Sequence, residues 1–302
     1  MNWRLKAFLQ LAFSHLPRGE GLNYFFQRHV TRSLPIEDAE CATTVAQARE
    51  HIAVLRRHWG GAFSHATLYE FGAGWDLMVP LAYYGLGVNR QVLVDIRPLV
   101  RLPLVNQAIN QLRRLARQLG LSRPPSESLP SDESAGLAVL KEHYGIDYRA
   151  PTDARATGLR AATVDCITST NTLEHIPFED IPQILTECRR LLRDDGVMSF
   201  RIDYQDHYAY FDRRISVYNF LQYSDRAWAK YNPALHYQNR LRHVDYTCLF
   251  RAGGFEVVEE HRADGSEKDL KTLTRLPLPA RLRTYPLRDV AVRTALVVLR
   301  KR

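Results

Sequence analysis

Two glycines that follow an apolar run are the residues of this chain best placed for ligand chemistry. The run begins at Thr67, has β propensity, and ends at Gly72 and Gly74, after which a helical pattern extends from Trp75 to Tyr84. This order predicts a strand, a glycine turn and a helix. Glycines let the main chain approach a ligand without an intervening Cβ, and the helix N-terminus offers free N–H groups to that ligand.

Two carboxylates, Glu70 and Asp95, indicate which ligand the turn accepts. Glu70 precedes the glycines, and Asp95 ends a second apolar run, residues 91–95, which we expect to be the next strand. A carboxylate at that position binds the two hydroxyls of a ribose. A dinucleotide site requires a third glycine, whose position is taken here by Leu77, and Glu70 would repel a phosphate. The residues therefore favour a cationic nucleoside without phosphates.

On these residues the chain resembles the class I S-adenosylmethionine-dependent methyltransferases. Their first motif reads acidic-x-Gly-x-Gly, as residues 70–74 do, and their second strand ends in an acidic residue, as at Asp95. The resemblance implies S-adenosylmethionine as cofactor and S-adenosylhomocysteine as product, with Ile96 packing on the adenine. It covers Thr67 to Ile202 together with the last strands.

Two further positions match the cofactor-binding pattern of this family. A predicted third strand, residues 146–149, is followed by Asp153, where the family places an acidic residue against the adenine amino group. A predicted fourth strand, residues 164–169, continues into Asn171 and the pair Glu174–His175, which resemble the family's motif after that strand. Open α/β folds bind ligands at the carboxyl ends of their strands. The resemblance therefore adds Asp153 and Asn171 to the expected cofactor site.

Histidines beside two predicted strand ends are the candidate general bases. Methyl transfer from a sulfonium needs little covalent help from the protein, but a hydroxyl acceptor must lose its proton. Histidine suits that step because its unperturbed pKa is near neutrality. We expect His175 and His207 to be candidate catalytic residues and Asp203 to orient a base or hold a substrate hydroxyl. The alternatives are that His175 shapes the cofactor loop and that Asp203 caps a helix.

The pair Glu174–His175 also resembles the motif of ubiquinone-biosynthesis O-methyltransferases. Some of these enzymes bind a divalent metal near this loop through an additional acidic residue, and the corresponding position here is Asn171. Because that carboxylate is missing, we expect no required metal.

A segment crowded with Tyr, His and Asn, residues 203–246, follows the predicted fifth strand, residues 197–202. Such side chains stack on planar or sugar rings and hydrogen-bond to ring hydroxyls. We therefore expect this insertion to bind the acceptor and expect O-methylation of a small molecule or saccharide. An aromatic cap that completes a small core is the alternative reading of these side chains.

Length, charge and cysteine content restrict the remaining choices. A chain of 302 residues suits one domain with elaborations. The net charge of +8 is concentrated toward the ends, but no recognised nucleic-acid module accompanies it, so we do not expect a nucleic-acid partner. The four cysteines have neither metal-ligand nor disulfide spacing, and the N-terminus does not read as a signal peptide. We expect a cytoplasmic protein and leave its oligomeric state open.

The N-terminal part of the chain has helical patterns and is expected to form a cap over residues 1–60. Met1 to Pro17 reads as an amphipathic helix that packs within the protein, covers a substrate, or makes a weak peripheral membrane contact. Of these, packing within the protein is the reading we favour. Residues 122–134, rich in Ser, Pro and acidic residues, are expected to form a mobile loop.

Together these elements predict an α/β fold, a doubly wound seven-stranded sheet of the Rossmann-like methyltransferase type. The N-terminal helical cap precedes a methyltransferase domain over residues 61–302, which carries the insertion after the fifth strand. The last two strands, residues 255–260 and 294–299, are expected to form the antiparallel pair of that family. Two other functions stay open: an NAD(P)-dependent Rossmann oxidoreductase, and a non-catalytic member that binds the cofactor or a partner.

Overall fold

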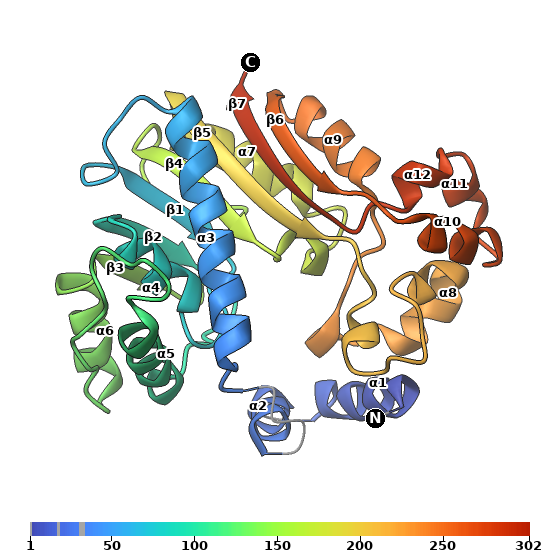
Figure 1. Cartoon of the computed structure of the whole chain (residues 1–302), viewed down its shortest axis with the longest axis horizontal. Coiled ribbons are helices and arrows are strands. Elements are labelled where there is room, and N and C mark those ends of the chain that lie inside the picture. The colour runs from blue at the N-terminus through green and yellow to red at the C-terminus, as the bar shows by residue number, and fades with distance from the viewer. Residues whose placement is uncertain (1, 17–18, 30–33) are drawn as a thin grey trace.

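A computed structural model describes residues 2–16, 19–29 and 34–302 of the chain, which form a seven-stranded sheet between layers of helices (Figure 1). The order across the sheet is β3-β2-β1-β4-β5-β7-β6, and β7 runs antiparallel to both of its neighbours. The doubly wound α/β fold and the antiparallel last pair are thus confirmed. The strands are β1 (Thr67–Phe71), β2 (Arg90–Val94), β3 (Ile146–Arg149), β4 (Val164–Thr170), β5 (Leu192–Asp203), β6 (Phe255–Ala263) and β7 (Thr294–Lys301).

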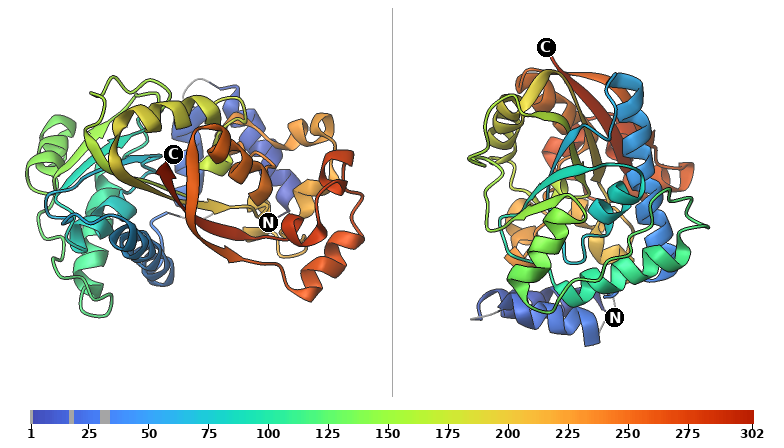
Figure 2. Two further views of the ribbon diagram at one scale, coloured as in Figure 1. Left: turned by 90° about the horizontal axis from the view of Figure 1, so that it is seen from above. Right: turned by 90° about the vertical axis from the view of Figure 1, so that its left-hand side faces the viewer.

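Each face of the sheet carries its own apolar core. Side chains of β1 alternate, so Leu68 packs into the core under α3 (Asp38–His58), α4 (Met78–Gly85), α5 (Leu102–Leu115) and α6 (Glu133–Glu142). Tyr69 and Phe71 pack into the opposite core with α7 (Ile181–Leu191) and α9 (His243–Ala252). Seen from above in Figure 2, the yellow-green α7 and the blue α3 lie on opposite sides of the sheet.

The differences from the predicted elements lie at their ends. The helix expected from Trp75 begins at Met78, because Gly74 and Leu77 have φ angles of 70° and 54° and place the residues between them in the turn. The helix after β4 ends at Leu191, one residue earlier than its apolar spacing indicates. Leu192 instead pairs with Val164 of β4 and begins β5.

A third apolar cluster, which we call the side lobe, lies beside the sheet and joins three distant segments (Figure 1). Trp3 of α1 (Trp3–Ser14) lies against the rings of Tyr208 and Tyr231, with centroids 5.5 and 4.9 Å away. Many aromatic side chains of the insertion therefore fill a core, as the alternative reading of this segment holds. The short helices of the side lobe are η2 (His207–Tyr210), η3 (Asn219–Gln222), α8 (Asp225–Trp228), η4 (Ala229–Tyr231), η5 (Ala234–His236), α10 (Glu267–Thr274), α11 (Ala280–Arg283) and α12 (Leu287–Val290).

The predicted N-terminal cap divides into parts with different positions. The long helix α3 belongs to the layer on the sheet, where its buried residues pack on α4 and the strands. The helix α2 (Gly19–His29) lies at the turn after β1, where Tyr24 stacks on Trp75 with ring centroids 5.4 Å apart. Residues 1, 17–18 and 30–33 of the predicted cap lie outside the described residues.

The segment 122–134 crosses the surface beside α4 and α5. Arg123 donates hydrogen bonds to the carbonyls of Tyr84 and Val88, and the side chain of Asn106 bonds to both the N–H and the carbonyl of Leu129. The mobility of the segment 122–134 stays a prediction. Within the described part of the chain, no helix has the length and apolarity needed to cross a membrane.

Candidate active site

A cavity of about 460 Å³ opens at the carboxyl ends of the central strands, between the loops that follow β1, β2, β3 and β4. The sequence predicted seven cofactor-binding residues, and six of them line this cavity: Gly72, Gly74, Asp95, Ile96, Asp153 and Asn171. The seventh, Glu70, lies elsewhere, as described below. His175, a predicted catalytic residue, also lines the cavity.

The two glycines of the turn meet different requirements. Gly72 has a φ of 86°, and a Cβ on it would lie 2.3 Å from Oγ1 of Thr172, so the loop after β4 packs directly on its backbone. Gly74 has a φ of 70°, but a Cβ there would meet nothing within 4 Å. The main chain at Gly74 is therefore open to close approach by a ligand.

Asp95 connects the ends of β1 and β2. Its Oδ2 accepts a hydrogen bond from the backbone N–H of Ala73 at 3.1 Å, and its Oδ1 accepts one from the N–H of Arg97 at 3.0 Å. Burial raises the pKa of this carboxyl, and these backbone bonds oppose the shift. A carboxylate oxygen has more than one acceptor position, so Asp95 retains the capacity to bind ribose hydroxyls while it holds the turn.

Asp153 and Ile96 form the far wall of the cavity. Asp153 pairs with Arg155 at 2.6 Å, and this contact lowers the pKa of the carboxyl despite its partial burial. Arg155 also contacts Asp180 at 2.6 Å. An adenine amino group at Asp153 would share the carboxylate with Arg155. Ile96 is 59% exposed, which leaves an apolar surface for a planar ring to pack on.

Glu70 lies on the opposite side of the glycine turn. Because side chains alternate along β1, Glu70 faces the α3 layer while Tyr69 and Phe71 face the other core. Its carboxyl accepts hydrogen bonds from the hydroxyls of Thr168 and Thr170, both at 3.2 Å, and burial raises its pKa to about 8. It lines a smaller cavity of about 190 Å³ together with Gly72 and Gly74.

The three predicted catalytic residues lie together, although they come from two separate loops. The rings of His175 and His207 are 4.9 Å apart, centroid to centroid. Nε2 of His207 lies 3.4 Å from Oδ2 of Asp203, and the hydroxyl of Tyr210 donates to the same carboxylate oxygen. His207 and Asp203 thus stand directly behind the histidine that lines the cavity.

Comparison with known proteins bears on this site. A family model described as a methyltransferase domain matches residues 131–200, from the start of α6 into β5, while no curated protein matches the chain. The matched segment carries β3, β4 and the loop with Asn171 and His175. This segment is therefore similar to a methyltransferase domain.

Several solved structures resemble the chain in part. The YcgJ protein of Bacillus subtilis is 12% identical, with 84% of this chain and 99% of that chain covered and a TM-score of 0.41. The 1,6-didemethyltoxoflavin N1-methyltransferase of Burkholderia thailandensis is 15% identical, with coverages of 92% and 85% and a TM-score of 0.47. The geranyl diphosphate C-methyltransferase of Streptomyces coelicolor is 14% identical, with coverages of 85% and 79% and a TM-score of 0.44.

The cavity suits S-adenosylmethionine better than a dinucleotide. The turn carries Leu77, a fully buried residue with left-handed φ, where a dinucleotide motif requires its third glycine. Of the described lining residues, the basic side chains are Arg97, paired with Glu20 at 3.4 Å, and the doubly paired Arg155. Acidic side chains with neutralised arginines fit a cationic nucleoside, so the NAD(P)-dependent alternative is set aside.

Hydrogen bonding fixes the orientation of His175. Its Nδ1 lies 2.7 Å from the carbonyl oxygen of Tyr237, and since a carbonyl only accepts, Nδ1 carries the proton and Nε2 has the free lone pair. The surrounding protein and the neighbouring His207 lower the pKa of His175 to about 4, although the residue is exposed where it lines the cavity, so the ring is neutral at pH 7. Burial of Asp203 is outweighed by its contacts with His207 and Tyr210, and the pKa of its carboxyl is lowered.

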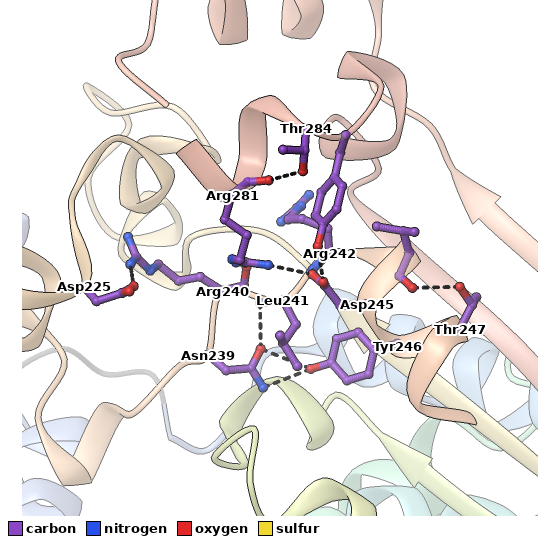
Figure 3. A network of polar contacts seen from close by, with 12 residues as sticks. Asp225, Asn239, Arg240, Leu241, Arg242, Asp245, Tyr246, Thr247, Arg281 and Thr284 are labelled. Atoms are coloured by element: carbon purple, nitrogen blue, oxygen red, sulfur yellow. Dashed lines mark hydrogen bonds and ion pairs between the residues drawn. The ribbon is translucent and has the colours of Figure 1, made fainter. Parts of the chain in front are cut away.

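The loop that carries His175 is held by the end of the insertion, where Asn239 lies beside Tyr246 (Figure 3). The side-chain amide of Asn239 donates to the carbonyls of Leu173 and Ile176, both at 2.9 Å, and its backbone N–H donates to the carbonyl of Glu174 at 2.7 Å. Asn239 also bonds to the hydroxyl of Tyr246 on α9. An insertion residue thus acts here by positioning the catalytic loop.

Three contributions were missed by sequence reasoning. Asn239 and Tyr210 belong to the insertion that was expected to bind the acceptor, and Thr172 lies between the motif residues Asn171 and Glu174. Only Thr172 had a local signal, because it follows the family motif position Asn171. The other two depend on which segments the fold brings together.

Proposed function

We propose that this chain is an S-adenosylmethionine-dependent methyltransferase that acts on an oxygen atom of a small molecule or saccharide, at the part of the cavity wall that His175 forms and behind which His207 lies. The observation that carries the proposal is the series His175, His207 and Asp203, which leads from the cavity into the protein. A histidine backed by a carboxylate is the arrangement that removes a proton from a hydroxyl. Nitrogen and carbon acceptors have less need of such a base.

Six cavity residues would hold the cofactor. S-adenosylmethionine, when bound, supplies the methyl group. Asp95 would take the ribose hydroxyls, and Ile96 and Asp153 would contact the adenine. Gly72, Gly74 and Asn171 would leave the main chain free for close approach. Glu70 would affect the cofactor indirectly, by supporting the glycine turn. Its carboxyl accepts hydrogen bonds from the hydroxyls of Thr168 and Thr170, on the side of the turn away from the cofactor cavity.

His207 is the group that we assign as general base. Asp203 lies 3.4 Å from its Nε2, where it orients the ring and stabilises the imidazolium that forms when the proton arrives. Tyr210 holds Asp203 in place through its hydroxyl. His175 would touch the acceptor from the cavity wall and would stay neutral at pH 7, because its pKa is lowered to about 4.

The acceptor class is inferred from a second cavity. This cavity, of about 430 Å³, adjoins the first across the loop after β4, since Ile176 and Pro177 line the first and Phe178 lines the second. Its lining includes Trp228, Tyr237, Asn232 and Gln238, which suit a planar or sugar ring with hydroxyls. The Streptomyces and Burkholderia enzymes named above methylate small molecules on carbon and nitrogen.

The location of the protein is proposed from its cysteines. All four are free, and three of them are buried. Free cysteines are typical of proteins in a reducing compartment, so we propose a cytoplasmic enzyme.

Two measurements test this function. Calorimetric titration should show micromolar binding of S-adenosylmethionine and S-adenosylhomocysteine and none of NAD(H), and an acceptor screen should begin with glycans and phenols. In His207→Gln we expect kcat to fall by about 10²–10⁴-fold with cofactor affinity unchanged. His261→Gln, an exposed histidine 59% accessible at its side chain, is the matched control. Cofactor binding without turnover on any acceptor would favour the non-catalytic alternative. An unchanged kcat in His207→Gln would show that His207 is not the general base.

A further inference from the structure

Glu174 is a buried carboxylic acid without a partner. The residue is 2% exposed, and neither Oε1 nor Oε2 has a hydrogen-bond partner. The neighbouring carboxylate of Asp203 adds unfavourable negative charge at the same place. A buried carboxyl in this situation is costly unless a positive charge or a donor compensates it. The backbone of Glu174 is well held by Asn239, so the unpartnered state of its side chain is a property of a rigid loop.

Two imidazoles face this carboxyl. One ligand atom from each of Glu174, His175 and His207 lies within 4.8 Å of the others. His175 donates its Nδ1 proton to the Tyr237 carbonyl, which leaves Nε2 as an acceptor. His207 has Asp203 against its Nε2. Histidines that bind metals characteristically donate their other N–H to a backbone carbonyl or carboxylate, and both outer partners are present here.

We propose that Glu174, His175 and His207 bind one divalent transition-metal cation beside the cofactor cavity, which His175 lines. A carboxylate and two imidazoles favour metals such as Zn²⁺, Fe²⁺, Co²⁺ and Mn²⁺ over Ca²⁺, which prefers oxygen ligands alone. Ligand bonds of about 2.1 Å hold ligand atoms no more than about 4.2 Å apart, so metal binding requires the three side chains to move closer than the 4.8 Å within which their ligand atoms lie. Three protein ligands leave coordination positions open for an oxygen of the acceptor.

This site revises the expectation from the sequence that no metal is required. That expectation rested on Asn171, which replaces an acidic residue of the ubiquinone-type motif. In the structure the third ligand comes from His207 in the loop after β5, so the ligand set does not need Asn171.

The inference rests on the proposed function and narrows its acceptor class to oxygen donors that coordinate a cation, such as vicinal hydroxyls. A nitrogen lone pair of His207 cannot bind a cation and a proton at once. With the cation bound, the metal would lower the pKa of the acceptor hydroxyl so that its proton leaves to solvent, and His207 would serve as ligand instead of base.

The test is a titration of the untagged full chain, freed of metal with a chelator, with Co²⁺ as the probe. We expect one equivalent to bind with a Kd of about 10 μM or tighter and to give the visible absorption of cobalt with nitrogen ligands. Glu174→Gln keeps the shape of the side chain and removes the charge, and it should weaken binding at least about tenfold, as should His207→Gln. His261→Gln should bind as the wild type does. If Glu174→Gln does not fold, the Co²⁺ affinity of His207→Gln alone tests the metal site.

Absence of saturable binding, or equal binding in Glu174→Gln and His207→Gln, would overturn the metal site. The proposed function fails separately: it is lost if S-adenosylmethionine binds but no acceptor is methylated, whatever Co²⁺ does. Turnover by the chelator-treated chain, with no Co²⁺ bound, would support the proposed function and contradict a role for the metal in it.

Discussion

Thr172 occupies the space into which a side chain at Gly72 would extend. A Cβ on Gly72 would come within 2.3 Å of Oγ1 and 2.4 Å of Cγ2 of Thr172, at a φ of 86°. We expect Gly72→Ala to lower the free energy of unfolding by about 2–4 kcal/mol, from left-handed strain plus the steric conflict. Urea denaturation measures this loss. Adding Thr172→Ala to the Gly72→Ala chain should restore the stability lost to the steric conflict and leave the loss that comes from backbone strain.

Gly74→Ala is the matched comparison within the same turn. Its φ of 70° carries the strain, but its Cβ would meet nothing within 4 Å, so we expect a smaller loss of about 1–2 kcal/mol. Gly74→Ala should also weaken cofactor binding, by more than its loss of stability alone would cause. The reason is that the new methyl group projects into the open space that the cofactor would occupy. Equal stability losses in the two variants would contradict this account.

Asp95 is the carboxylate on which cofactor binding should depend most. Asp95→Ala removes the acceptor for the ribose hydroxyls and also the bonds to the N–H groups of Ala73 and Arg97. We expect the Kd for S-adenosylmethionine and S-adenosylhomocysteine to rise at least about tenfold, measured by calorimetry. Asp264→Ala, a change at a side chain 61% exposed, is the control. An unchanged Kd in Asp95→Ala would mean that the cofactor lies elsewhere.

Glu70 should make the stability of the protein depend on pH. Burial raises the pKa of its carboxyl from 4.5 to about 8 in the folded chain. Between these values the folded state holds a proton that the unfolded state has released, so stability falls as pH rises through this window, by about 1 kcal/mol per pH unit. In Glu70→Gln, the free energy of unfolding should therefore fall less between pH 5.5 and pH 7.5 than it does in the wild type. Denaturation curves at the two pH values measure the difference. A slope identical to that of the wild type would show that Glu70 is not responsible.

Helix α1 leaves an apolar strip on its outer side. Trp3 and Ala7 are buried in the side lobe, whereas Leu5 and Phe8 are 52% and 66% exposed. We propose a weak peripheral contact with anionic membranes through these side chains, helped by the net charge of +8. In vesicle flotation, the wild type should bind partially and the double variant Leu5→Glu/Phe8→Glu should not. A wild-type chain that stays with the unbound fraction would exclude the contact.

The sequence determined the elements that obey local rules. Alternation of apolar residues marked β1 and β4, helical spacing marked α7, and glycines that need positive φ marked the cofactor turn. The predicted cofactor residues Asp95 and Asp153 follow strand ends, and parallel strands end at one edge of a sheet, so their position on one cavity was predictable.

The tertiary structure decided what depends on contacts between distant segments. Trp3 meets Tyr208 and Tyr231 in the side lobe, so aromatic residues predicted to face a substrate fill a core instead. His175 meets His207 because β4 and β5 are neighbours, and Glu174 is left without a partner because of how the surrounding loops pack. No local pattern encodes these contacts, since their free energy arises only when the separate segments are buried against one another.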